Sequence, residues 1–408
     1  MDPAQFTSTQ FGTVEREPGK KWAFHYFRPA PIPRTLELAP RTVQLLSQAD
    51  AAVGQLQGLA QVIQDPELLV GPYLRREAVA SSRIEGTQAS LSDLLQAEAA
   101  EGERPSEDVA EVERYLAATR HGYQAIRTLP ITQRLLKEIH AILLEGVRGE
   151  EKLPGELRRS PVWIGATHDN PDTAIFVPPL PDEVPAALAD WEAFVNTPGD
   201  LPTLVRCGLM HYQFETIHPF LDGNGRIGRL LINLMLAEEG RLDHPLLYLS
   251  GFFESHRSEY YYRLQKVREE GQIQEWLQFF LQAVKEQATD ANRRSRHLIA
   301  IRERYLAEAA GTRSSLPALA RSLFTNPFVT VRQVARLTGL SNQGARNLIH
   351  NAAERGWLSE VGVLGRGGRT YWVAQDVFNV IDAPMAYLAE SAERSAAGFD
   401  QLTRIEPR

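Results

Sequence analysis

The stretch His218-Pro-Phe-Leu-Asp-Gly-Asn-Gly-Arg-Ile-Gly-Arg229 lies between two segments with the apolar spacing of buried helices. The first segment, 201–217, is ended by Pro219, which places His218 at a helix end beside a cleft. The second segment begins at about Arg226. The loop between the two helices is therefore the expected functional segment of a mainly α fold.

The loop carries the groups that a nucleotide phosphate requires. Gly223-Asn-Gly225 directly precedes the second helix, so its N–H groups and the helix N-terminus favour an anion. Asp222 would repel phosphate unless a cation such as Mg²⁺ lay between them. Arg226 and Arg229 are spaced to grip a polyphosphate. His218, with an ordinary pKa near neutrality, is the candidate general base.

Each part alone has a plainer explanation. A Gly-Asn-Gly is usually a turn, a single His is usually structural, and a surface Arg is usually solvated. Their combination within one short stretch favours a phosphoryl or nucleotidyl transfer site.

The stretch resembles the defining motif of the Fic family, His-Pro-Phe-x-Asp/Glu-Gly-Asn-Gly-Arg-x-x-Arg, and matches it at every specified position. The similarity covers about residues 30–290 and implies a Fic-type helical bundle. It also implies a protein adenylyltransferase, in which a Ser, Thr or Tyr hydroxyl of a protein, this chain included, attacks the α-phosphate of ATP. By this resemblance His218 is the catalytic base and Asp222 holds Mg²⁺. The nucleotide-binding residues that it implies are Phe220, packed beneath His218, with Gly223, Asn224, Gly225, Arg226 and Arg229.

Two aromatic residues outside the motif, Tyr260 and Tyr261, look like the adenine-side aromatics of the family. Packing in a helix core is the alternative for each of them. Arg268 stands where the family has an Asn that contacts adenine, so the sequence departs from the family pattern at that position.

A second motif, Ser81-Ser-Arg-Ile-Glu85-Gly86, resembles the inhibitory Ser/Thr-x-x-x-Glu-Gly/Asn motif of the family. The inhibitory residues that it implies are Ser81, Glu85 and Gly86. Glu85 is expected at a helix end with Gly86 as the C′ residue, which fixes the carboxylate so that it can pair with Arg229. That pair would deny the arginine to the γ-phosphate, so an autoinhibited enzyme is expected.

The segment 160–179 is rich in β-branched and aromatic residues around Asp169-Asn-Pro-Asp172, which predicts a β-hairpin. By resemblance this hairpin is the flap of the family, which docks the target as an added strand. The flap residues expected to meet the target are Val162, Ile164 and Gly165.

The C-terminal pattern predicts a winged helix-turn-helix over 314–380. A helix over 331–338 is followed by a turn and by a second helix from Ser341 through Arg355, with Ser341 as N-cap. Two strands within 358–373 form the expected wing.

The winged helix has two candidate partners. DNA is favoured by residues that can meet phosphates or base edges, namely Arg346, Arg355, Arg366 and Arg369, with Asn342 and Gln343. A protein partner, including a second copy of the chain in a homodimer, is favoured by the net charge of −7. Both partners stay open.

These patterns divide the chain into five parts. They are 1–100, an arm and helical region with the inhibitory motif; 101–290, the catalytic core; 291–313, a helical linker; 314–380, the winged helix; and 381–408, a C-terminal helix or tail. Within the first part, residues 1–35 are expected to form an extended arm across the next domain, because prolines interrupt any helix there.

The composition is that of a globular protein, with 43% hydrophobic and 23% charged residues. Neither a run of about 18 apolar residues nor a signal peptide is evident, which predicts a cytoplasmic protein with no membrane contact. The one cysteine, Cys207, is expected to be a buried, inert thiol.

Two other functions stay open for the whole chain. One is a DNA-binding regulator whose Fic core only senses ATP. The other is a Fic enzyme that removes AMP or transfers another phosphate-containing group. Glu85 could position a water molecule for the removal of AMP.

Overall fold

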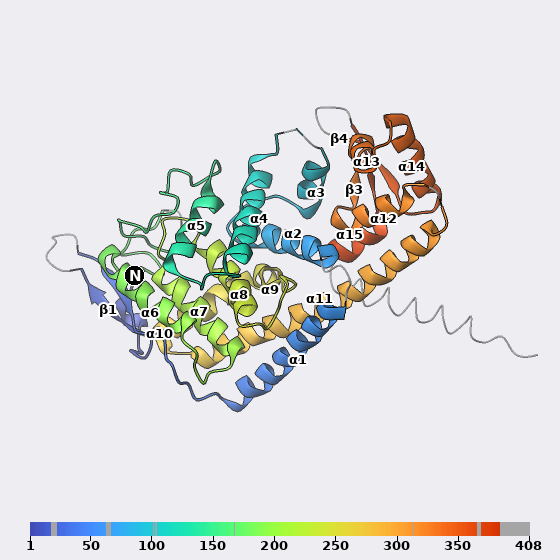
Figure 1. The fold of residues 1–408 in the computed structure, drawn as a ribbon. Coiled ribbons are helices and arrows are strands. Elements are labelled where there is room, and N and C mark those ends of the chain that lie inside the picture. Colours follow the sequence, from blue (N-terminus) through green and yellow to red (C-terminus); the bar gives the residue numbers. More distant parts are fainter. Residues whose placement is uncertain are drawn as a thin grey trace, which may run out of the picture. The chain divides into compact units, whose positions relative to one another are not determined.

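Helices dominate the computed structural model, which Figure 1 draws as a ribbon. The structure describes residues 1–17, 23–62, 67–100, 102, 104–166, 168–312, 314–364 and 369–383. Among these residues the strands form two small antiparallel sheets. The mainly α fold expected from the sequence is confirmed. None of the described helices combines the length and the apolar character needed to cross a membrane.

The chain forms two compact units. The first comprises Met1–Ile63, Glu77–Ala89 and Pro105–Thr289, and the second comprises Gln64–Arg76, Ser90–Arg104 and Asp290–Arg408. Each unit thus combines segments that are distant in sequence. The five-part linear division stays a prediction.

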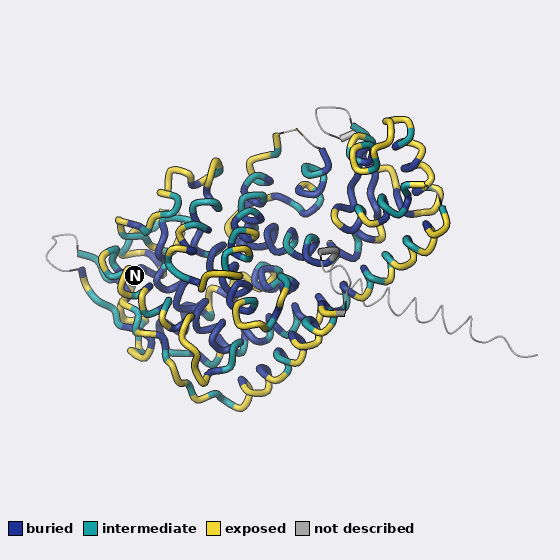
Figure 2. The backbone as a smooth tube through the Cα atoms, viewed as in Figure 1, coloured by how far each residue is buried: buried dark blue, intermediate teal, exposed yellow. Residues whose placement is uncertain are grey.

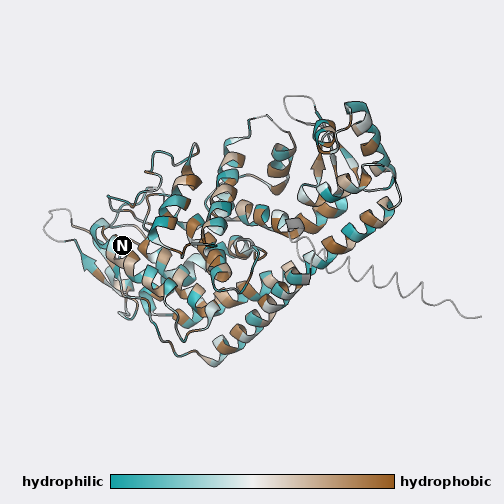
Figure 3. Ribbon diagram, viewed as in Figure 1, coloured by the Kyte–Doolittle hydropathy of each residue, from teal (hydrophilic) through white to brown (hydrophobic). Residues whose placement is uncertain are grey.

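The first unit is built mainly from helices. They are α1 (Pro40–Val62), the end of α2 (Glu67–Ile84), α4 (Glu107–Ala125), α5 (Gln133–Leu144), α6 (Val184–Asn196), α7 (Thr203–Ile217), α8 (Asn224–Glu238), α9 (Leu249–Ser255), α10 (Arg257–Glu270) and the start of α11 (Ile273–Ala309). Two short 3-10 helices, Pro3–Gln5 and Pro181–Glu183, accompany them. Figure 3 shows hydrophobic and hydrophilic residues alternating along α11, as an amphipathic helix requires.

The core of the first unit surrounds α7. Every residue of this helix from Leu204 to Ile217 is buried, and most of α8 is buried as well (Figure 2). A helix that is buried on all sides occupies the centre of a bundle. Cys207 lies in this core, and burial raises the pKa of its thiol, so the expected inert thiol is in place.

The N-terminal arm is folded rather than merely extended. Strands β1 (Gly12–Arg16) and β2 (His25–Pro29) pair antiparallel. The N–H of Phe27 donates to the carbonyl of Val177 at 2.8 Å, which attaches β2 to the segment expected to form the flap. A small core made by Met1, Tyr26, Phe27, Ala174, Phe176 and Val177 closes over this contact.

The prediction that residues 160–179 form a two-stranded β-hairpin is wrong. The described residues of this segment have one antiparallel bridge, in which Ile164 and Phe176 exchange hydrogen bonds of 2.8 and 3.1 Å. On the open side of the bridge Pro178 carries no N–H group and cannot continue the ladder. Toward the tip, the N–H groups of Ala166 and Ala174 donate instead to Asp169 and Asn170 of the turn. At the tip, the side chain of Asn170 accepts from the N–H of Asp172 at 2.9 Å, as in an Asx turn.

The second unit combines helices with a three-stranded sheet. Its elements are the start of α2, α3 (Leu91–Ala100), the end of α11, α12 (Leu316–Thr325), β3 (Phe328–Val329), α13 (Val331–Thr338), α14 (Asn342–Glu354), β4 (Ser359–Leu364), β5 (Arg369–Val373) and α15 (Gln375–Asp382). The strand order is β3-β5-β4, and both pairings are antiparallel. Arg366 lies outside the described residues.

The two helices of the expected helix-turn-helix have the predicted bounds within one or two residues. Gly339 ends α13 with a φ of 71°, a conformation that glycine adopts without strain. The Oγ atom of Ser341 then accepts from the N–H of Gly344 at 3.2 Å and caps α14. The elements agree with a helix-turn-helix followed by a β-hairpin, and their assignment as a winged helix stays a prediction.

Candidate active site

His218 ends α7 in an unusual backbone conformation. Its φ of 48° and ψ of 63° lie in the left-handed region, which costs a residue other than glycine free energy and recurs at functional sites. The N–H of His218 donates to the carbonyl of Phe214 at 2.9 Å. The Nδ1 atom of the imidazole is buried and has no hydrogen-bond partner among the described residues. The imidazole therefore has unused hydrogen-bonding capacity.

Burial lowers the pKa of His218 to about 3, with further contributions from the guanidinium groups of Arg158 and Arg268. The pKa near neutrality that the sequence suggested is therefore wrong, because neither the burial nor the two arginines can be seen in the motif. At neutral pH the imidazole is uncharged, which is the form that accepts a proton.

Arg158 holds the end of α7, and no motif in the sequence points to it. Its Nε atom donates to the carbonyl of His218 at 2.8 Å, and its Nη2 atom donates to the carbonyls of Ile217, at 3.3 Å, and Pro179. The side chain is buried, which lowers its pKa to about 10. A cation at a helix C-terminus satisfies carbonyls that lack partners within the helix. Arg158 therefore stabilises the left-handed conformation of His218.

The loop after His218 is held by Asn224. Its Oδ1 atom accepts from the N–H of Phe220, and its Nδ2 atom donates to the carbonyl of Phe220, both at 2.9 Å. The amide side chain of Asn224 therefore fixes the conformation of the loop. Phe220 is fully buried, and its ring stacks on His140 with a centroid distance of 3.9 Å.

His140 packs against the loop that follows His218, although no motif in the sequence singles it out. Its Nδ1 atom accepts from the N–H of Gly155 at 2.7 Å, so its Nε2 atom carries the proton and donates to the carbonyl of Asp222 at 3.1 Å. Burial lowers the pKa of His140 to about 4, which keeps this neutral form at physiological pH. The imidazole thus fixes the backbone beside the expected metal ligand.

Asp222 is the candidate metal ligand. Its Oδ1 atom accepts from the N–H of Gly223 at 2.5 Å and lies 3.5 Å from the Nη2 atom of Arg226. The side chain is 38% exposed, so the carboxylate can reach a ligand. The described residues contain no group of three His, Cys, Asp or Glu side chains that could hold a metal ion on their own. A lone carboxylate fits Mg²⁺ that is held jointly by phosphate oxygens.

Arg226 is a buried guanidinium with unused donors. Its Nε and Nη1 atoms have no hydrogen-bond partner among the described residues, and the side chain is 3% exposed. The carboxylate of Asp222 lies 3.5 Å from its Nη2 atom. The carboxylate of Glu111 lies 4.0 Å from its Nη1 atom and already accepts from Thr87 and Arg148. Buried N–H groups without acceptors are costly. An anion at the start of α8 would supply the missing acceptors.

Arg229 is held by the segment that carries the expected inhibitory motif. Its Nε atom donates to the Oγ atom of Ser81 at 3.0 Å, and its Nη2 atom donates to the carbonyl of Ser81 and to the Oε1 atom of Glu85, both at 2.8 Å. Gly86 follows with a φ of 101°, in the turn that ends α2. The pairing of Glu85 with Arg229 that the sequence suggested is present.

The carboxylate of Glu85 lies directly over the start of α8. A Cβ atom on Gly225 would be 2.2 Å from the Oε1 atom of Glu85, so only glycine leaves room for this contact. Burial acts to raise the pKa of Glu85, but Arg229 outweighs burial and lowers it. Burial likewise acts to lower the pKa of Arg229, and Glu85 raises it. Each group therefore keeps the other charged.

The two tyrosines lie in different environments. Tyr260 is fully buried, and its hydroxyl donates to the Nε2 atom of His211 at 2.8 Å, which favours core packing for this residue. Tyr261 is 40% exposed and lies within 5.9 Å of the guanidinium of Arg257. Arg268 is buried, and its guanidinium lies over the ring of Phe176 at 3.9 Å. Adenine contacts by the two tyrosines stay a prediction.

The flap residues lie around the single bridge. Ile164 forms the bridge and packs against the small N-terminal core. A Cβ atom on Gly165 would be 2.2 Å from the carboxylate of Asp169, so a side chain there would displace this carboxylate. Val162 is half-buried just before the bridge. Docking of a target through these residues stays a prediction.

Two segments of the chain match known family domains. Residues 43–124 match the Fic/DOC family N-terminal domain, and residues 130–236 match the Fic/DOC family domain. The first segment contains Ser81 and Glu85, and the second contains the stretch from His218 to Arg229. The chain therefore carries Fic/DOC family domains.

Named relatives are similar to part of the chain. The protein adenylyltransferase Fic of Drosophila grimshawi is 32% identical over 156 residues, which are 38% of this chain and 29% of that protein. The protein adenylyltransferase Fic of Drosophila melanogaster is 31% identical and shares 38% of this chain and 28% of its own length. The chain thus spans less than a third of these relatives.

A solved structure resembles the fold over most of its length. The crystal structure of a Fic family protein from Desulfovibrio desulfuricans G20 has a TM-score of 0.54 and covers 84% of this chain and 98% of its own. At 22% sequence identity the likeness concerns the fold alone.

Proposed function

From the Fic/DOC family matches and the geometry around His218, we propose that the chain is a protein adenylyltransferase, which transfers AMP from ATP to a Ser, Thr or Tyr hydroxyl of a protein. The observation that carries this proposal is the buried Arg226, whose unused donors lie at the start of α8. Arg226 and His218, whose imidazole is neutral, both interact with the carboxylate of Glu85. An anion-binding helix end next to a proton acceptor is what attack by a hydroxyl on a phosphate requires.

In the proposed reaction the hydroxyl oxygen attacks the α-phosphorus, and the bond to the pyrophosphate oxygen breaks. The hydroxyl proton passes to the imidazole of His218, and the products are the AMP-protein and pyrophosphate. Arg226 and the N–H groups of the loop stabilise the charge on the phosphates. Mg²⁺, held by Asp222 together with phosphate oxygens, would offset further negative charge when bound.

The same proposal includes a resting state. Arg229 is occupied by Glu85 and Ser81, so a γ-phosphate would have to compete with a carboxylate for the guanidinium. We infer that Glu85 restrains nucleotide binding in the orientation needed for transfer. The segment that ends α2 would then act as an internal inhibitor.

The direct test is the transfer of labelled AMP in a cell lysate by the purified chain and by His218→Ala. Transfer should be lost in the variant, while calorimetry should still detect ATP binding, because His218 accepts a proton and does not hold the phosphates. Retained transfer would remove His218 as the base. ATP binding without transfer by Glu85→Gly, in which Arg229 is released, would favour an ATP-sensing regulator.

A further inference from the structure

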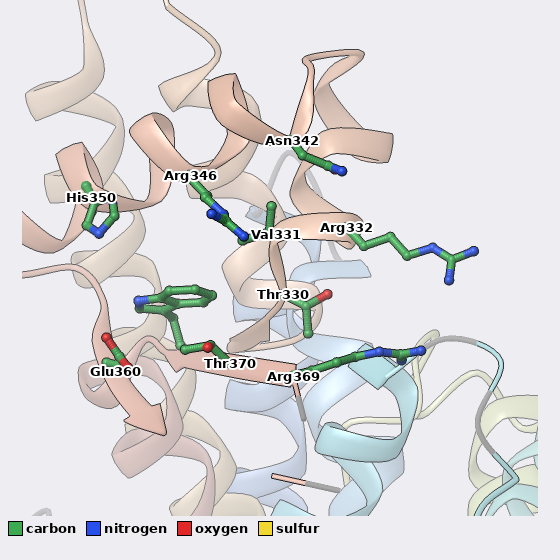
Figure 4. Close-up of a pocket in the computed structure, with 10 residues that line it drawn as sticks. Thr330, Val331, Arg332, Asn342, Arg346, His350, Glu360, Arg369 and Thr370 are labelled. Atoms are coloured by element: carbon green, nitrogen blue, oxygen red, sulfur yellow. The ribbon is translucent and has the colours of Figure 1, made fainter. Parts of the chain in front are cut away.

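A polar groove in the second unit is not used by the proposed reaction. It has a volume of about 520 Å³ and lies between α14, the start of α13 and the strands β4 and β5 (Figure 4). Three arginines line it, Arg332 from α13, Arg346 from α14 and Arg369 from β5. Glu360 is the only acidic residue among the lining residues of the described chain.

The positive charge gathers at one end of this groove. Figure 4 shows Arg332 and Arg369 extending toward the same side of the groove. Glu360 and His350 lie at the opposite end, and Arg346 lies between the two ends. Neither Arg332 nor Arg346 forms an ion pair within the described part of the chain. Both side chains belong to exposed residues. Their charges are therefore available to an anionic partner.

The local charge contrasts with that of the chain. Residues 331–353, which make up α13, the turn and nearly all of α14, contain three Arg and no Asp or Glu, although the net charge of the chain is −7. The one carboxylate of this helix pair is Glu354 at the end of α14, so an acidic protein here has a local surface suited to polyanions.

The two faces of α14 differ in chemistry. One face is buried through Ala345, Leu348, Ile349 and Ala352. The opposite face is exposed and carries Asn342, Gln343, Arg346, Asn347 and His350. Amide and guanidinium groups make paired hydrogen bonds with base edges. The core of a protein interface is depleted in charged residues and enriched in aromatic ones, and this face has no apolar side chain.

We propose that this surface binds duplex DNA, with α14 in the major groove. A major groove about 12 Å wide admits a helix. If α14 lies in the major groove, the β4–β5 hairpin faces the adjacent groove. The phosphate backbone that separates these two grooves then runs between the helix and the hairpin. Arg332, Arg346 and Arg369 line that space and contact the phosphates, while Asn342 faces the bases. The proposal does not rest on nucleotide transfer.

The test uses the full chain and a fluorescein-labelled, mixed-sequence duplex of about 25 base pairs, long enough for two turns of DNA. Fluorescence anisotropy at several KCl concentrations from about 50 to 200 mM gives the slope of log K against log salt. Three phosphate contacts predict a slope of about −2.7. Arg346→Ala and Arg332→Ala should each weaken binding and reduce the magnitude of the slope by about 1.

Arg321→Ala is the matched control, because Arg321 is exposed on α12 and does not line the groove. It should bind like the wild type, and circular dichroism should show that all three variants are folded. The proposal would be overturned by the absence of binding at low salt, or by equal losses in all three variants. It would also be overturned if Arg346→Ala left DNA binding intact and instead changed the oligomeric state in sedimentation, which would assign the face to a second copy of the chain.

Discussion

Burial acts in opposite directions on the acid and the base at the end of α7. It lowers the pKa of His218 to about 3 and raises the pKa of Glu215 to about 7. Both groups are therefore uncharged over part of the physiological range. The Oε1 atom of Glu215 has no hydrogen-bond partner among the described residues and would lie 2.4 Å from a Cβ atom on Gly228, so a carboxylate is packed tightly under α8.

The pH dependence of transfer follows from the pKa of His218. An ordinary imidazole gives an acid limb near pH 6.5 in kcat/KM. Because His218 is already neutral well below that pH, kcat/KM of Glu85→Gly for ATP with excess Mg²⁺ should show no limb centred there. The profile should be repeated in the Glu85→Gly, Glu215→Gln double variant, which lacks the nearby acid. A limb near pH 6.5 that persists in the double variant would contradict the low pKa of His218.

Glu215 makes a separate prediction about stability. Its pKa is raised from 4.5 to about 7 in the folded chain, so its contribution to stability is full below pH 4.5 and is lost as the pH rises to 7. Glu215→Gln keeps the shape and cannot ionise. Relative to this variant, the wild type should lose about 3 kcal/mol of unfolding free energy between about pH 4.5 and 7. Urea unfolding at several pH values measures the difference, and parallel profiles of the two proteins would rule out a buried carboxyl that titrates.

The elements nearest the site depend on partners from distant parts of the chain. Next to the bridge between Ile164 and Phe176, the N–H of Phe27 in β2 donates a hydrogen bond to the carbonyl of Val177. Isolated pairs of strands are marginally stable in water. The N-terminal hairpin therefore supports the flap.

Phe27→Ala tests this support. Phe27 is fully buried in the small N-terminal core, and truncation of a buried Phe costs about 3 to 5 kcal/mol. Amide hydrogen exchange of residues 174–177 should become faster by at least tenfold, which corresponds to about 1.4 kcal/mol of local stability. Arg16→Ala, on the exposed end of β1, should leave the exchange unchanged. Unchanged exchange of residues 174–177 in Phe27→Ala would show that this segment is stable without support from the β1–β2 hairpin.

Elements fixed by local signals could be predicted from the sequence. The cap at Ser341, the turn at Gly339 and the break after α7 all depend on neighbouring residues. The prediction for residues 160–179 gave too much strand pairing, because it did not account for the prolines in this segment, which lack an N–H group. Strand β2 could not be placed, since its partners include a residue about 150 positions away that no local pattern reveals.

The candidate site was predictable in part for the same reason. The stretch from His218 to Arg229 carries its chemistry in adjacent residues, and the Glu85–Arg229 pair followed from a second short motif. His140, Arg158 and Glu111 act through tertiary contacts, such as the bond between His140 and Asp222, 82 positions apart. The burial that sets the pKa of His218 is likewise a property of the folded chain.

At the scale of the whole molecule, the chain combines a first unit with a candidate transfer site and a second unit with a positively lined groove. The Fic/DOC family matches end at residue 236, before the groove residues begin. The two proposals thus concern separate parts of the chain and can be tested separately.

The central claim is AMP transfer restrained by Glu85, and the most direct measurement compares ATP labelled at the α- or the γ-phosphate. With Glu85→Gly, protein should gain the α label at least about tenfold faster than with the wild type, because a charge-assisted hydrogen bond of about 2 kcal/mol no longer occupies Arg229. The γ label should stay in pyrophosphate. Incorporation of the γ label, or α labelling no faster than in the wild type, would contradict the account.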